Sequence, residues 1–162
     1  MRTNDSISAL LKKGHIAITV AVCLFMSCTT DTVYHHFERT AEGGWDKRDT
    51  FFFKIDTVIT AGIYATTLCI RTDADYPYRN LSVRTVQVVK PGNGVSTHTL
   101  NLNIRQESGI PAGDGITLYN YEVPVGTLTL RPGDSLTVKV AHNMRRETMP
   151  GVTDVGLKVT KQ

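Results

Sequence analysis

The sequence lacks both a block of like charge and a catalytic motif. Its 162 residues carry a formal net charge of +3, and most of that excess lies ahead of Cys28. The 18 basic and 15 acidic residues fall to 15 and 14 once Arg2, Lys12, Lys13 and Asp5 are set aside. This balance argues against a basic patch for nucleic acid. No G-x-S-x-G, P-loop or H-E-x-x-H pattern is present to suggest an enzyme.

Apolar runs are too short to cross a membrane. The run at 16–26, IAITVAVCLFM, has 11 residues and is bounded by two lysines before it and by Thr-Thr-Asp after Cys28. A bilayer-spanning helix needs about 20 apolar residues. The segment is therefore interpreted as the apolar part of a signal peptide over residues 1–27. Because Ser27 directly precedes Cys28, we expect cleavage there and lipidation of Cys28, with simple secretion or a retained anchor as the alternatives.

Cysteine is scarce, with three in the whole chain. Cys23 lies in the leader and Cys28 is expected to be acylated, so Cys69 has no partner for a disulfide within the chain. We interpret Cys69 as a small buried apolar residue rather than a nucleophile. His35 and His36 are adjacent and would point to opposite faces of a strand, so they cannot easily bind one ion together. No metal and no small-molecule cofactor is expected.

The rest of the chain consists of short runs rich in β-branched and aromatic residues, separated by Gly, Pro and Asp. This pattern predicts an all-β domain over residues 33–162, preceded by a lipidated tether at 28–32. Strands are expected at about 32–38, 50–56, 62–71, 81–89, 96–102, 116–125, 134–143 and 153–160.

Alternation within these runs indicates how the strands pack. The runs at 134–143 and 153–160 alternate apolar and polar residues, which is typical of strands with one buried and one wet face. We therefore expect an antiparallel β-sandwich of about seven or eight strands, either immunoglobulin-like or jelly-roll-like. The run at 81–89 changes phase after Val83, which predicts a bulge or a change of packing partner near Thr85.

The densest cluster of unusual residues is AHNMRRETMPGVTDVG, at 141–156. Its distinctive side chains are His142, Met144, Arg145, Arg146 and Asp154. The hairpin formed here is expected to bring one of the two arginines close to the aspartate. A structural ion-pair network is one interpretation, and a partner-docking surface on a rigid sandwich is the other. The one tryptophan, Trp45, is expected to be a packed lid over the core.

Taken together, these blocks resemble the gliding-motility-associated lipoprotein family GldH. The resemblance rests on the leader ending at Cys28, on Tyr34 and Phe37, and on the blocks GGWDKRD (43–49), DYPYRNL (75–81, with Tyr78) and VAHNMRRETMPGVTDVGLKV (140–159). It implies an envelope lipoprotein that, in gliding bacteria, is required for movement of surface adhesins. It also implies association with the machinery that serves type IX secretion, and it carries no catalytic residue.

Three classes of function are therefore weighed. The leading hypothesis is a non-enzymatic structural or assembly component, tethered through Cys28 and docking onto envelope proteins through residues 142–154. The candidate docking or structural network comprises His142, Met144, Arg145, Asp154, Trp45 and Tyr78. The second is an envelope binding module for a glycan or protein ligand, and the third is an enzyme. In Gram-negative-type envelopes of this kind, several acidic residues just after the lipidated cysteine would signal export to the cell surface. Here Asp31 is the single acidic residue soon after Cys28, which favours a periplasm-facing protein.

Overall fold

The structure is a computed structural model that describes residues 31–162, all of whose regular elements are strands. The predicted signal peptide and the lipidation site Cys28 lie outside the described residues. The strands are β1 (Asp31–Arg39), β2 (Trp45–Asp46), β3 (Phe51–Ile55), β4 (Gly62–Asp73), β5 (Asn80–Lys90), β6 (Gly94–Asn103), β7 (Leu118–Leu130), β8 (Ser135–His142), β9 (Thr148–Met149) and β10 (Val152–Lys161).

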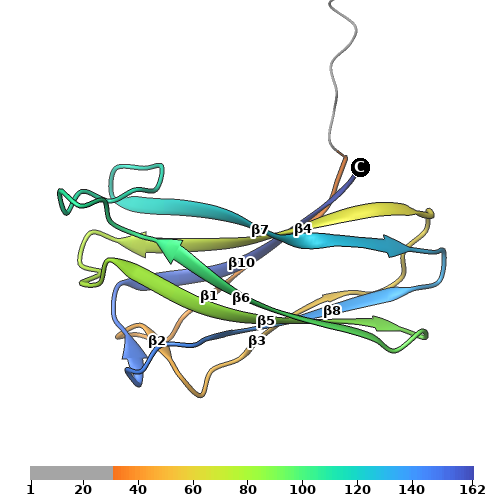
Figure 1. Cartoon of the computed structure of the whole chain (residues 1–162), viewed down its shortest axis with the longest axis horizontal. Helices are drawn as coiled ribbons and strands as arrows, with labels where there is room; N and C mark the ends of the chain where they lie inside the picture. The colour runs from red at the N-terminus through yellow and green to blue at the C-terminus, as the bar shows by residue number, and fades with distance from the viewer. Residues whose placement is uncertain (1–30) are drawn as a thin grey trace, which may run out of the picture. The chain divides into compact units, whose positions relative to one another are not determined.

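Two four-stranded antiparallel sheets form the molecule, in the orders β1-β10-β4-β7 and β3-β8-β5-β6. They lie one above the other in Figure 1. The all-β antiparallel sandwich expected from the sequence is confirmed. All eight long strands overlap the expected runs, and the two short strands β2 and β9, which pair only with each other, were not expected. β1 begins at Asp31, two residues ahead of the expected start of the domain.

The core lies between the sheets and follows from the alternation in the sequence. Leu136, Val138 and Val140 of β8 face inward and are buried. They meet inward residues of β10 and β4, including Leu157 and Leu68, in one hydrophobic cluster. Burial of apolar area at about 25 cal/mol per Å² is the main stabilising contribution to such a core.

Of the two alternatives expected near Thr85, a bulge or a change of packing partner, the bulge is wrong. β5 pairs with β6 over residues 80–90 and with β8 over 83–90 without a register shift in either ladder. The inward row of β5 simply becomes polar, because Thr85 and Gln87 are both buried. Gln87 donates from Nε2 to Oγ1 of Thr66 at 2.9 Å across the core. Val86 lies on the opposite face of the same regular strand.

The strand connections divide between two ends of the sandwich. Four meet at one end, at residues 40–50, 74–79, 104–117 and 143–151, and we call this the loop end; it lies at the left of Figure 1. The opposite end has the connections 56–61, 91–93 and 131–134. Residues 31–162 contain no helical segment that could serve as a transmembrane span.

Candidate functional site

The short ladder between β2 and β9 joins two of the four connections at the loop end. Trp45 pairs with Met149, and the amide of Lys47 donates to the carbonyl of Glu147 at 2.7 Å. The approach is close because Gly44 has no side chain. A Cβ on Gly44 would lie 2.2 Å from the carbonyl oxygen of Met149, and its φ of +113° also favours glycine.

Trp45 is a lid over the core, as expected. The indole is fully buried, and its Nε1 donates to the carbonyl of Asp49 at 3.1 Å. Its ring meets His142 nearly edge to face, with 5.4 Å between centroids, and Phe51 at 5.6 Å. Edge-to-face contacts of this kind suit the aromatic quadrupole. The sequence placed Trp45 and His142 in one candidate network, and the structure brings them into contact.

His142 continues the inward row of β8 and is therefore buried. Its Nδ1 accepts a hydrogen bond from the amide of Met144 at 3.3 Å, which favours the neutral ring with its proton on Nε2. Nε2 is buried and has no hydrogen-bond partner among the described residues. Burial lowers the pKa of His142 below its ordinary value, and the nearby Lys47 ammonium acts in the same direction. This histidine is a neutral structural group at physiological pH.

Met144 and Tyr78 also pack against the core. The sulfur of Met144 accepts a hydrogen bond from the amide of Ser82 at 3.3 Å, and Met144 packs against the core. Tyr78 is half-buried and meets the ring of Tyr76 nearly edge to face at 5.7 Å. Tyr76 itself is fully buried and donates its hydroxyl to the carbonyl of Asn80 at 2.9 Å.

The expected pairing of Arg145 or Arg146 with Asp154 is wrong. Asp154 instead lies 4.0 Å from Nε of Arg39, on the neighbouring strand β1, where the register places the two residues opposite each other. The side chain of Asp154 is only 12% exposed. Both arginines are exposed on the 143–151 connection, and neither forms an ion pair within residues 31–162.

Arg105 organises the loop end and was missed from the sequence. Its Nε donates to the carbonyl of Tyr76 and its Nη1 to that of Gly109, each at 2.8 Å, while Nη2 donates to the carbonyl of Ala74. One guanidinium thus ties the 104–117 connection to the 74–79 connection. An arginine beside a turn has no local pattern that would have revealed these partners.

An open hollow of about 650 Å³ lies at the loop end between the 40–44 segment and the start of β10. Its charged lining residues are Arg39, Glu42, Asp73, Asp75 and Asp154. The four carboxylates outnumber the single guanidinium, so the hollow is acidic. Asp73 also accepts a hydrogen bond from the amide of Asp75 at 2.9 Å, which stabilises the turn after β4.

His35 and Cys69 lie on the outer face of the β1-β10-β4-β7 sheet. His35 contacts the ring of Phe37 and His36 bonds Glu38, so the two histidines do point to opposite sides of β1. Cys69 is buried on the outer side of the β1-β10-β4-β7 sheet. Burial, followed by the Glu122 carboxylate, raises the pKa of the Cys69 thiol to about 11, so this thiol is a poor nucleophile.

Three solved structures illustrate the likeness of this chain to known folds. A carbohydrate-binding module CBM35 from Cellvibrio japonicus Abf62 is 15% identical, with 83% of this chain and 93% of that chain covered and a TM-score of 0.37. Dimeric latent PorU from Porphyromonas gingivalis is 9% identical, with 84% of this chain and 14% of that chain covered and a TM-score of 0.37. A family GH115 4-O-methyl-α-glucuronidase is 11% identical, with 85% and 18% covered and a TM-score of 0.41. Scores below 0.5 do not establish a shared fold.

Sequence comparison is more informative. A curated protein from Christiangramia forsetii, described as a gliding motility lipoprotein GldH homolog, is 26% identical over 153 residues, which cover 86% of this chain and 90% of that protein. The model of the GldH lipoprotein family matches residues 32–159, almost the whole of the sandwich. The match spans both sheets and all four connections of the loop end, so the chain belongs to the GldH lipoprotein family of gliding motility.

Proposed function

We propose that this protein is a non-enzymatic structural or assembly component of envelope machinery for gliding motility or type IX secretion, and that it docks through its loop end. The meeting of the three resemblance blocks carries this proposal. Residues 43–49 and 140–159 join in the β2–β9 ladder, and Gly151 lies against the backbone of Tyr76 in the block 75–81. Segments so distant in sequence build one surface.

The chemistry of this surface suits binding better than catalysis. His142 is buried beneath Trp45, and Asp154, although it lines the hollow, is only 12% exposed and lies 4.0 Å from the Arg39 guanidinium. The exposed groups of the loop end include Arg145 and Arg146 on the 143–151 connection, and the acidic hollow opens at the same end. Arginine is enriched in protein interfaces because its guanidinium can donate several hydrogen bonds in a fixed geometry. Docking to envelope proteins is the function that these groups support best.

Attachment through Cys28 would leave the loop end free to reach partners. Cys28 precedes Asp31 by three residues, which span at most roughly 11 Å when extended. Asp31 pairs with Lys161, which in turn pairs with Tyr64 near the start of β4, so the described chain begins away from the loop end. The nine residues of β1 then carry the chain about 26 Å to the loop end. A periplasm-facing protein anchored in this way presents the docking surface away from the membrane.

Site-specific crosslinking in intact cells tests the docking surface. A photoreactive amino acid at Arg146 should capture motility or type IX secretion components, and the same group at Arg131, an exposed arginine at the opposite end, should not. Arg145→Ala with Arg146→Ala should reduce capture of those partners by a probe at Glu147, because both guanidinium groups are lost while the packed residues remain. Equal capture from both ends, or unchanged capture by the double variant, would contradict the proposal.

The anchor is tested separately. Cys28→Ala should move the protein from the detergent phase to the aqueous phase in detergent partitioning, because three acyl chains would be lost. Cys69→Ala is the matched control and should stay in the detergent phase. A Cys28→Ala protein that remains membrane-bound would rule out lipidation at this residue.

Protease added to intact cells should leave the native protein uncut if it faces the periplasm, and cleavage would place it on the surface.

A further inference from the structure

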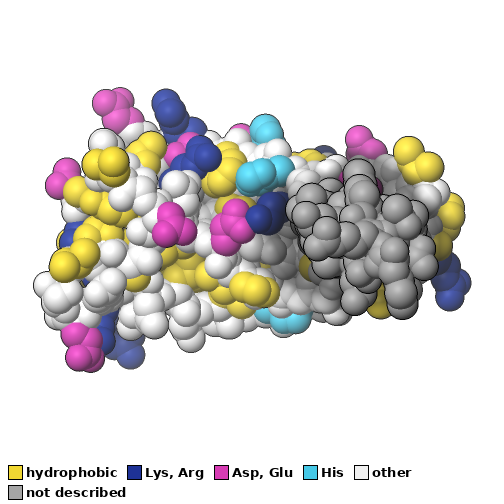
Figure 2. Space-filling view, turned by 90° about the horizontal axis from the view of Figure 1, so that it is seen from above, with side chains coloured by type: hydrophobic (Ala, Val, Ile, Leu, Met, Phe, Trp, Pro, Cys, Tyr) yellow, Lys and Arg dark blue, Asp and Glu magenta, His cyan; other side chains and the backbone are white. Residues whose placement is uncertain are grey.

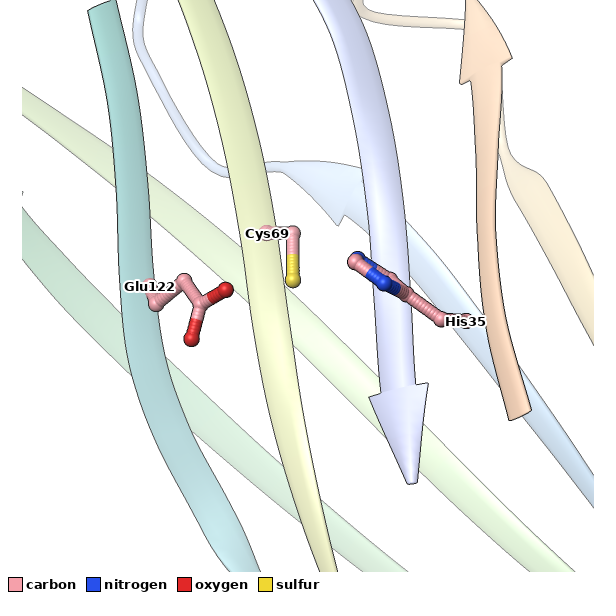
Figure 3. A group of neighbouring side chains, drawn as sticks. All are labelled: His35, Cys69 and Glu122. Carbon is pink, nitrogen blue, oxygen red and sulfur yellow. The ribbon is translucent and has the colours of Figure 1, made fainter. Parts of the chain in front are cut away.

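We propose that His35, Cys69 and Glu122 form a binding site for a thiophilic divalent cation such as Zn²⁺. One ligand atom from each of these residues lies within 4.8 Å of the other two. The three side chains come from β1, β4 and β7 and converge on the outer face of one sheet (Figure 3). The sulfur lies between the imidazole and the carboxylate in this view.

The register of the sheet explains how three separate strands supply one site. Glu122 is directly opposite Cys69 in the β4–β7 ladder, and Gly156 of β10 is opposite Cys69 on its other side. Gly156 has no side chain on the outer face of β10, and the Phe37 ring of β1 occupies this place. A Cβ there would lie 2.6 Å from the Phe37 ring, which stacks beside His35. A larger residue at position 156 would displace the Phe37 ring and, with it, the His35 ring that packs against Phe37.

The donor set selects the class of cation. An imidazole nitrogen, a thiolate sulfur and a carboxylate oxygen are all ligands that zinc accepts at about 2.0–2.3 Å, whereas calcium and magnesium require oxygen ligands. Binding would replace the thiol proton of Cys69, which passes to solvent, and would leave a fourth position for water. Cys69 is buried while His35 and Glu122 are exposed, so the site opens to solvent on one side.

Charged side chains surround the proposed site, and one of them already contacts a proposed ligand. Lys158, the residue of β10 opposite His35, contacts the Glu122 carboxylate. The guanidinium of Arg71 lies 3.8 Å from the centre of the Phe37 ring. Acidic, basic and histidine side chains accordingly gather at the middle of this face in Figure 2. The Lys158 ammonium competes for Glu122, and its removal should strengthen cation binding.

Cobalt and zinc titrations of the full-length protein in detergent test the site. Wild-type protein should bind one Co²⁺ with thiolate-to-cobalt charge-transfer absorption, and Zn²⁺ should displace it and raise the Tm. Cys69→Ala should abolish the absorption and the Tm rise. His35→Ala should weaken Zn²⁺ binding by more than the roughly 10–100-fold loss that follows removal of a supporting outer-shell group. Lys158→Met should tighten binding by up to about fivefold.

His36→Ala is the matched control, since His36 neighbours His35 but bonds Glu38 on the other side of the strand. It should bind both ions as the wild type does. Cys23 is expected to leave with the signal peptide and the Cys28 thiol to carry the lipid, so a thiolate–cobalt band that survives in Cys69→Ala would come from outside the proposed site and would overturn the assignment. Absence of the band from the wild-type protein, or weaker binding by Lys158→Met, would overturn it as well.

Discussion

Replacement of Trp45 by alanine should remove much of the stability of the sandwich. The indole is fully buried, and side chains of this size bury about 150–250 Å². At about 25 cal/mol per Å², that area is worth roughly 4–6 kcal/mol, in line with losses of about 3–5 kcal/mol for Trp→Ala changes in cores. The lost hydrogen bond to Asp49 adds about 1 kcal/mol. We therefore expect a loss of about 5 kcal/mol, a large share of the roughly 5–15 kcal/mol that stabilises a typical domain.

Guanidinium denaturation of the full-length protein in detergent, followed by circular dichroism, measures this loss. Trp45→Phe keeps an aromatic edge against His142 and should lose about 1–2 kcal/mol. Phe52→Ala is the control, because Phe52 is 53% exposed, and its loss should stay below about 1 kcal/mol. A Trp45→Ala protein within about 1 kcal/mol of the wild type would refute the view that the indole joins the 40–50 and 143–151 connections.

Three further changes probe the loop end. Arg105→Ala should lower the unfolding free energy by about 2 kcal/mol, and Arg105→Lys should not restore it, because a single ammonium nitrogen cannot reach the three carbonyls that three separate guanidinium nitrogens contact. Gly44→Ala should be worse than Gly43→Ala in the same denaturation assay, since both have positive φ but only a Cβ at Gly44 meets backbone; equal losses would contradict this. His142 has a lowered pKa when folded, so the unfolded chain takes up the proton first and stability should fall as the pH drops below about 6.5. Urea unfolding at a series of pH values should show this slope in the wild type and a shallower one in His142→Gln.

The sequence predicted the sandwich well because strand alternation is a local signal. Runs such as 134–143 show their buried face without reference to any partner. The same logic failed at β5, where Thr85 and Gln87 occupy buried positions that alternation assigns to apolar residues. Nε2 of Gln87 donates to Thr66 on the facing sheet, whereas Oγ1 of Thr85 has no hydrogen-bond partner among the described residues. A contact between sheets cannot be read from one strand.

The sequence predicted several residues of the candidate site correctly but not all of the contacts that they make. Trp45 and His142 were placed in one network, and they do touch. The partner of Asp154 was wrong because a hairpin suggests pairing with a near neighbour such as Arg145, whereas β1, more than 100 residues earlier, lies beside β10 and supplies Arg39. The grouping of His35 with Cys69 and Glu122 escaped for the same reason, since it depends on strand order rather than on spacing.

The core and the loop end therefore place different demands on the sequence. The inward rows need only be apolar and of suitable size, and many sequences would satisfy them. The loop end is more demanding, because Gly44 must admit the Met149 carbonyl, Trp45 must cover His142, and Arg105 must reach across two connections. These constraints hold the connections of the loop end in one arrangement. A surface whose shape is held so firmly, with arginines left at its rim, is suited to recognising a partner of fixed shape.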